Sequence, residues 1–276
     1  MKVILSRKGF DGVNGGMPSP IMPNGDTVSM PIPSDDRVLY KNLKYGDKDY
    51  QSILNDLKPG YRFEECHLDP DLDDKRLLCR PKSWKPAFGQ IGASSSYLIN
   101  TVGLKPGDLF LFFGNFHFVE ECDGRLRFAR RTGDFYKDKT IQLIWGYLQV
   151  GEIITDGEII KKKYPWHPHA IVGRVDEPSN ILIVPSKTLS FAKSRPGYGL
   201  LRFTEDRVLT RKGSNKATWC NNPVYSPDSI IGRRKSMSSE GIYYSGIWQE
   251  LGLKESPAAT RWARNVVLCD ENKGNG

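Results

Sequence analysis

A polar, glycine-rich loop at residues 6–20 follows the first apolar segment of the chain and holds several groups that can do chemistry. Arg7 and Lys8 are cationic donors that can hold phosphate or carboxylate oxygens. Asp11 and Ser19 are candidate proton acceptors or nucleophiles, and adjacent glycines let backbone N–H groups approach an anion. We assign these residues, with an amide from a later segment, to the binding of phosphate or a similar anion: Ser6, Arg7, Lys8, Gly15, Gly16, Ser19 and Gln90. The alternative is a surface turn with incidental charges.

A second segment, His67-Leu68-Asp69-Pro70-Asp71, alternates three groups that can serve as acid, base or metal ligand. In an extended stretch, residues two apart share a face, and Pro70 would fix the backbone between them. The pattern indicates a general base or a site for a hard metal. An acidic turn capped by its own side chains is the alternative. We take His67, Asp69 and Asp71, with Asp11, as the candidate catalytic residues.

Two further segments carry weaker signals. Gln90 lies in a stretch with two glycines, ahead of a predicted helix whose N-terminus could seat an anion, although a plain helix start has the same composition. His167 and His169 are two residues apart and could share a metal in an extended segment. They follow Tyr164-Pro165-Trp166, so we expect a structural turn there and assign no metal ligand. The sequence identifies no cofactor.

These candidates must be positioned by strands, few short helices and long loops. Val3–Leu5 predicts a first strand, and the glycines and prolines of residues 9–36 predict a long loop after it. Helices are expected at 50–57, with Asp49 as N-cap, and at 94–102, ended by Gly103. The other strands are expected at 37–45, 109–113, 115–120, 126–130, 140–154, 181–184, 200–203 and 265–269. The predicted fold is α+β, a β-rich single domain with a central mixed or antiparallel sheet, for which a PUA-like partial barrel is one possible form.

Composition excludes some classes of protein and favours others. The 276 residues are 38% hydrophobic and 11% aromatic, which excludes an intrinsically disordered chain. No apolar run approaches the length of a membrane helix, so we expect no membrane partner. Five scattered cysteines without a paired motif, and no secretory leader, favour the cytoplasm.

The charge balance adds a modest indication of a polyanionic partner. Forty Lys and Arg against 32 Asp and Glu give a net charge of +8. The basic residues form clusters that could contact DNA, at 125–131, 161–163, 207–212 and 233–235. Each cluster alone is better explained as a solvated face, although the clusters together favour a surface that contacts phosphates. The oligomeric state is left open.

Several of these segments together resemble one family, the nucleotide modification associated domain type 3 (Nmad3) of bacteria and phages. The resemblance rests on segments in order along the chain: 3–11 with Gly15-Gly16 and 18–20, 67–71, 88–90, 106–114, 145–152, 167–169 and 266–270. It implies one domain over residues 1–270, with 271–276 as a solvated tail, and a role beside DNA or nucleotide modification. Residues 94–97 and 115–117 depart from the family pattern, so no catalytic role is carried over to them.

Three functions remain open at this point. The first is an enzyme that acts on a nucleotide or base, in which Arg7, Asp11, His67 and Asp69 converge in one pocket. The second is a non-catalytic reader, which predicts an aromatic cage beside a basic stripe. The third is a nucleotide-binding sponge or sensor in phage–host conflict. The sequence leaves open whether the protein is an enzyme.

Overall fold

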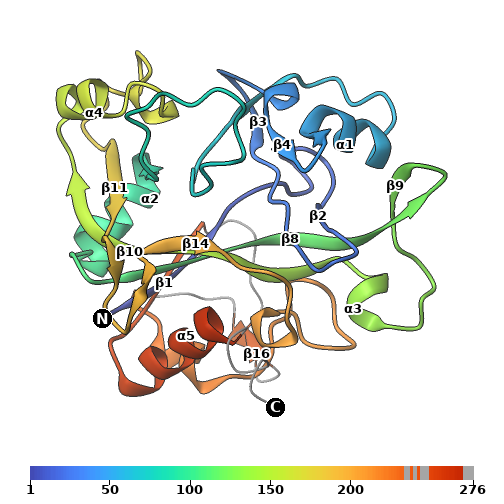
Figure 1. Cartoon of the computed structure of the whole chain (residues 1–276). Helices are drawn as coiled ribbons and strands as arrows, with labels where there is room; N and C mark the ends of the chain where they lie inside the picture. The colour runs from blue at the N-terminus through green and yellow to red at the C-terminus, as the bar shows by residue number, and fades with distance from the viewer. Residues whose placement is uncertain (233–236, 239–240, 243–248, 270–276) are drawn as a thin grey trace.

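A curled sheet of nine strands forms the centre of the computed structural model, which describes residues 1–232, 237–238, 241–242 and 249–269 (Figure 1). Its main path is, in spatial order, β17 (Glu250–Leu253), β1 (Val3–Arg7), β8 (Leu109–Cys122), β10 (Ile141–Ile154), β11 (Ile181–Pro185) and β7 (Phe88–Gln90). Three more strands pair with its two longest members: β2 (Ser19–Ile21), β9 (Arg125–Phe128) and β14 (Tyr198–Leu200). The sheet bends into a partial barrel.

The sheet is mixed rather than purely antiparallel, which is one of the two arrangements that the sequence predicts. β8 runs parallel to β1 and β2 and antiparallel to β9 and β10. The continuous apolar run at the start of β8 is buried on both faces. Leu109, Leu111 and Phe113 pack in one apolar cluster, and Phe110 and Phe112 pack in another on the opposite face. The α+β class is confirmed, while the comparison with PUA-like barrels stays a prediction.

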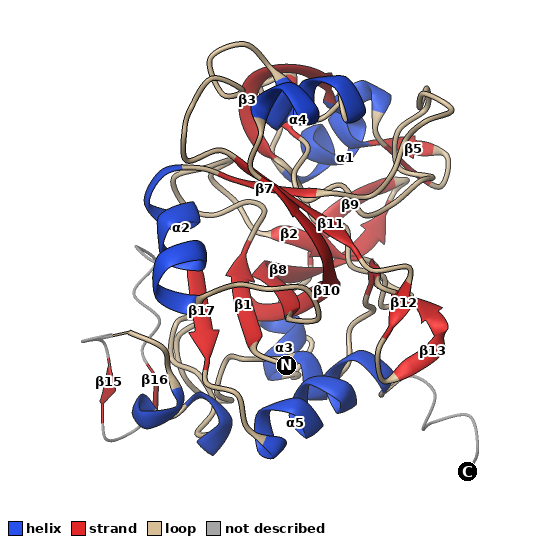
Figure 2. Ribbon diagram, turned by 90° about the vertical axis from the view of Figure 1, so that its left-hand side faces the viewer, coloured by secondary structure: helices blue, strands red, loops and turns tan. Residues whose placement is uncertain are grey.

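The other elements are short. The remaining strands are β3 (Ile32–Leu39), β4 (Lys44–Tyr45), β5 (Lys48–Asp49), β6 (Glu65–His67), β12 (Thr188–Leu189), β13 (Ala192–Pro196), β15 (Met237–Ser238) and β16 (Gly241–Ile242). The helices are α1 (Tyr50–Leu57), α2 (Gly92–Ser96), α3 (Phe135–Asp138), α4 (Gly157–Lys163) and α5 (Pro257–Leu268). Figure 2 shows α1 and α4 at one end of the molecule and α5 at the opposite end. Within the described ranges, no helix combines the length and apolarity needed to cross a membrane.

Both predicted helices are confirmed. The Asp49 carboxylate accepts the backbone N–H of Ser52 at 2.9 Å, which caps α1 as expected. α2 continues as a π-helical turn over Tyr97–Val102 and ends at Gly103, whose φ of 61° is the left-handed value that favours glycine.

Some predicted strands have different bounds. The strand expected at 37–45 starts earlier, inside the expected loop, and ends at Leu39, where a 3₁₀ turn follows. Residues 109–120 form a single strand rather than two. Of the stretch expected at 200–203, only Leu200 is in a strand. The tail at 271–276 and the basic cluster at 233–235 lie outside the described residues.

The strand expected at 265–269 is wrong, because these residues belong to helix α5 and its C-cap. Ala259, Ala263 and Val267 are buried against the sheet at helical spacing. Their spacing outweighs the strand propensity of the adjacent valines. Ser256 and Pro257, an N-cap and a first-turn proline, are the signals that mark the helix start.

The cap of α5 yields a testable prediction. Ser256 Oγ accepts the Ala259 N–H at 3.0 Å, so Ser256→Ala leaves a helix-terminal donor without this partner. We expect a loss of about 1 kcal/mol in the free energy of unfolding, measured by urea denaturation. Ser256→Asp keeps an acceptor and should retain wild-type stability. Equal stability of the alanine variant and wild type would contradict this role for Ser256.

Candidate functional site

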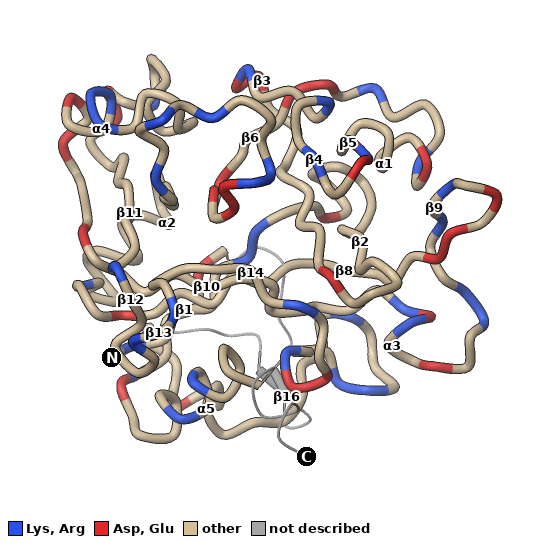
Figure 3. The backbone as a smooth tube through the Cα atoms, viewed as in Figure 1, with Lys and Arg blue, Asp and Glu red and all other residues tan. Residues whose placement is uncertain are grey.

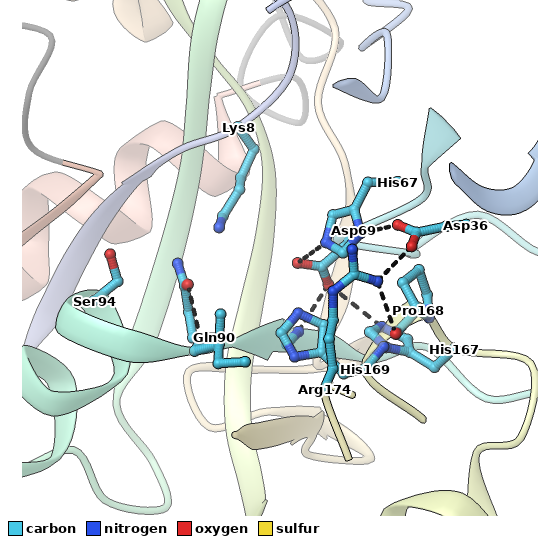
Figure 4. A network of polar contacts seen from close by, with 12 residues as sticks. Lys8, Asp36, His67, Asp69, Gln90, Ser94, His167, Pro168, His169 and Arg174 are labelled. Atoms are coloured by element: carbon cyan, nitrogen blue, oxygen red, sulfur yellow. Dashed lines mark hydrogen bonds and ion pairs between the residues drawn. The ribbon is translucent and has the colours of Figure 1, made fainter. Parts of the chain in front are cut away.

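A cavity of about 290 Å³ lies at the C-terminal end of β1, where the predicted loop begins. Its lining comes from residues 7–14, 32–34, 67–69, 89–91 and 169–174, with Gln249. The chain thus brings the first loop, the end of β6 and the strand β7 to one place. Figure 4 shows the polar groups that meet there.

Asp69 occupies the centre of this network. Its side chain is only 2% exposed, and Oδ1 accepts the Gly89 N–H at 2.7 Å. His167 Nε2 lies 3.3 Å from Oδ1, and His67 Nε2 lies 3.8 Å from Oδ2 (Figure 4). Burial alone would raise the pKa of Asp69, but contact with His167 and the nearby positive charge of Lys8 lower it well below its usual range. Asp69 is therefore a carboxylate at neutral pH.

His67, at the end of β6, is oriented by a second carboxylate. Its Nδ1 lies 2.5 Å from Asp36 Oδ2, and Arg174 donates to Asp36 Oδ1 at 2.5 Å. Burial would raise the pKa of Asp36, yet these two partners lower it to about 2. Since the carboxylate can only accept, His67 donates its Nδ1–H there. The Nε2 of His67 is left facing Asp69.

His169, about a hundred residues after Asp69 in the sequence, is the third member of the cluster around Asp69. Its Nδ1 lies 2.6 Å from Asn180 Oδ1, while the Asn180 amide donates to the His169 carbonyl at 3.0 Å. Nδ1 therefore carries the hydrogen and Nε2 a lone pair. Burial lowers the pKa of His169 to about 3, so the ring is neutral at pH 7. Neutral imidazole with a lone pair can bind a proton or a metal ion.

The His167-Pro168-His169 segment forms the expected turn, a 3₁₀ helix over Pro168–Ala170. Within this turn the His169 N–H donates to His167 Nδ1 at 3.2 Å. Both imidazoles lie in the network around Asp69 (Figure 4). His167 Nε2 then carries the ring hydrogen and faces Asp69. The motif was visible in the sequence, but its proximity to Asp69 was not.

Four of the predicted binding or catalytic side chains of the first loop and β7 line the cavity: Arg7, Lys8, Asp11 and Gln90. Asp11 Oδ1 also accepts the N–H groups of Val13 and Asn14 at 2.8 and 2.7 Å, so its carboxylate shapes the loop. The Nη2 atom of Arg7 lies 3.5 Å from Oδ2 of Asp11. Lys8 lies over the Phe88 ring, its Nζ 4.5 Å from the centroid.

Other predicted residues lie outside the lining. Ser6 donates to the buried Glu250 at 3.0 Å, and Ser19 Oγ accepts the Met30 N–H at 3.0 Å. Gly15 and Gly16 adopt φ values of 87° and 71°, so both are needed for the shape of the loop.

Asp71 is not brought to the cavity either. Its carboxylate accepts two hydrogen bonds from Arg80, each 2.6 Å, and one from Trp84 Nε1 at 2.8 Å. The expectation that residues 67, 69 and 71 share a face does not hold, because β6 ends at His67 and the strand pleat ends with it. This geometry gives Asp71 the role of anchoring the loop to Arg80.

Sequence reasoning missed several contributors to the site. Asp36 and Arg174 orient His67, and Asn180 orients His169. Gly89 is also essential to the packing, because a Cβ there would lie 2.2 Å from the His169 ring. Gly89 stands in the 88–90 segment of the family resemblance, but Asp36, Arg174 and Asn180 stand in no recognisable motif, and only the fold brings them to the histidines.

Comparison with known proteins gives one result that concerns the whole chain. The model of the family described as nucleotide modification associated domain 3 matches residues 2–262 of 276. No curated protein and no solved structure matches the chain. The match covers most of the chain, including every residue of the cavity network. The chain therefore belongs to the nucleotide modification associated domain 3 family, Nmad3.

Proposed function

We propose that this protein is an enzyme that binds a nucleotide or modified base in the cavity around Asp69, in a process linked to DNA base modification. One observation carries the proposal. Arg7 and Asp11 come from the first loop and His67 and Asp69 from a segment more than fifty residues further on, yet all four line one cavity. Such convergence of cations, a buried carboxylate and histidines is typical of an active site. Family membership supports the link to nucleotide modification.

The cavity divides into two functional parts. Arg7 and Lys8 lie where they can bind the phosphate of a nucleotide. The cluster of His67, Asp69 and His169 forms the reactive end, because one nitrogen or oxygen atom of each side chain lies within 4.8 Å of those of the other two. Gln90 can bind a base edge or sugar hydroxyl between the two parts.

A non-catalytic reader fits the cavity less well. A reader that stacks a base needs aromatic side chains beside it. Among the described residues that line the cavity, none is phenylalanine, tyrosine or tryptophan. Seven of the sixteen described lining residues carry ionisable side chains instead, which favours chemistry over stacking.

DNA binding through the basic clusters has weaker support. Figure 3 shows Lys and Arg spread along the described chain and interspersed with Asp and Glu. Within the predicted clusters, Arg207 is buried and donates to the Val266 carbonyl, and Arg127 pairs with Glu120 at 2.9 Å. Lys161, Lys162 and Lys163 are exposed on α4. We therefore propose a nucleotide or base as the principal ligand, with contact of DNA by α4 as a secondary possibility.

We also propose that residues 1–270 act as one domain in the cytoplasm. β1, near the N-terminus, pairs with β17, near the C-terminus, in the same sheet. The five cysteines are free thiols, which fits a reducing compartment.

Removal of the two cations tests the phosphate part of the cavity. We expect the double variant Arg7→Gln, Lys8→Gln to bind deoxynucleoside monophosphates at least about 100-fold more weakly, since each of the two charged hydrogen bonds contributes about 1.5–3 kcal/mol. Calorimetric titration measures the affinity. Arg261→Gln, on helix α5 at the opposite end of the molecule, is the matched control and should bind as wild type. Unchanged affinity in the double variant would overturn the assignment of these two residues.

Incubation with nucleotides and with modified DNA, followed by mass spectrometry, tests the whole proposal. A changed product supports an enzyme. A retained but unchanged ligand identifies a reader or sponge instead, and the absence of binding to either class of ligand contradicts the proposed function.

A further inference from the structure

We propose that His67, Asp69 and His169 bind a divalent transition-metal ion at the reactive end of the cavity. One potential ligand atom of each residue lies within 4.8 Å of the other two. Two imidazoles and one carboxylate are a donor set for Zn²⁺, Fe²⁺ or Mn²⁺. Three protein ligands leave positions open for water or substrate, as in catalytic metal sites.

The hydrogen-bond partners of the two histidines support this assignment. Asp36 Oδ2 holds the Nδ1 of His67 at 2.5 Å, and Asn180 Oδ1 holds the Nδ1 of His169 at 2.6 Å. In both rings Nδ1 donates to a fixed acceptor, so Nε2 is the nitrogen available to bind a metal ion. Metal-binding histidines almost always have their second nitrogen held in this way. Two histidines oriented in this way beside one carboxylate therefore support the proposed metal site.

The surroundings of Asp69 leave one oxygen available. Oδ1 receives the Gly89 N–H and the contact from His167, while Oδ2 faces His67 (Figure 4). The Cδ2–Nε2 edge of His169 lies against Gly89, the residue whose N–H donates to Asp69. Ligand atoms bound to one ion lie roughly 3–3.5 Å apart, so atoms that lie up to 4.8 Å apart must approach each other by up to about 1.5 Å on binding.

The charge of the cavity gives a reason for an ion at this position. Each cation already lies within 4 Å of a carboxylate: Arg7 with Asp11, Lys8 with Glu250, and Arg174 with Asp36. In the described part of the chain, Asp69 forms no such ion pair with Lys or Arg, and its ion-pair contacts within 4 Å are with His67 and His167. A divalent ion would balance Asp69 and add positive charge for a phosphate. This role rests on the proposed function, but metal binding itself does not.

Titration of metal-stripped protein with Co²⁺ tests the site without any nucleotide. We expect visible ligand-field bands, saturation at one ion per chain, and a rise in the thermal midpoint of about 5 °C at 100 times the dissociation constant. His169→Ala should weaken Co²⁺ binding by about 100-fold or more, and Asp36→Asn by about 10–100-fold through loss of the carboxylate that orients His67. His117→Ala is the control, since both His117 nitrogens contact Thr140 and Ala129 instead.

Two results would overturn the metal site: no saturable Co²⁺ binding by wild-type protein, or equal binding by His169→Ala and wild type. If a variant fails to fold, the imidazole ¹⁵N resonances of wild-type protein provide the test. Zn²⁺ should shift the Nε2 signals of two histidines and leave that of His117 unchanged. Nucleotide binding without metal binding would leave the proposed function intact and contradict this inference alone.

Discussion

Replacement of Asp69 by asparagine is expected to abolish metal binding and turnover, with losses of at least about 100-fold in each. Asparagine has the same size and can still accept the Gly89 N–H, so the fold should persist. It lacks the negative charge, however, and places an amide where Oδ2 faces His67. We expect the free energy of unfolding to fall by about 2 kcal/mol, because a charge-assisted hydrogen bond becomes a neutral one. Co²⁺ titration and urea denaturation measure the two effects.

The same change at Asp71 separates the two carboxylates of the loop. Asp71→Asn weakens the paired hydrogen bonds to Arg80, so we expect a stability loss of about 3 kcal/mol. Metal affinity should stay close to wild type, because Asp71 does not line the cavity. Equal loss of metal binding in both variants would instead support the catalytic role that the alternating pattern predicts for Asp71.

The sequence was sufficient to predict which segments supply the ionisable groups that line the cavity. A glycine-rich loop after a buried strand and a segment dense in ionisable groups are local signals, and Arg7, Asp11, His67 and Asp69 do meet. The alternation rule failed at Asp71 because it applies only within a strand, and β6 ends at His67.

Contacts between distant segments could not be predicted in the same way. About a hundred residues separate His169 from Asp69 in the sequence. Helix and strand periodicities relate only residues that are a few positions apart, so they cannot predict this contact. His169 is brought to Asp69 because β11 pairs with β7, and Asn180, next to the start of β11, binds the 3₁₀ turn. The residues that contact the His167 and His169 pair therefore cannot be predicted until the order of the strands in the sheet is known.

Gly89→Ala is expected to have the second large effect, although it adds only one methyl group. Gly89 lies in β7, and its φ is not in the positive range, so the backbone itself tolerates alanine. The new Cβ would lie 2.2–2.6 Å from three atoms of the His169 ring, which must therefore move. We expect about 100-fold weaker Co²⁺ binding, as for loss of an oriented ligand, and a stability loss of about 1–3 kcal/mol from overpacking. Gly12→Ala is the control, since no atom lies within 4 Å of its Cβ position.

A double-mutant cycle identifies the cause of the Gly89→Ala effect. If the clash with the imidazole is responsible, Gly89→Ala should cost little stability in a His169→Ala background, where the ring is absent. The two changes would then be strongly non-additive, with a coupling free energy of about 1–3 kcal/mol. Additive losses would mean that the methyl group acts elsewhere, for example on the pairing of β7 with β11. In that case Gly89 would not be the residue that seats His169 beside Asp69.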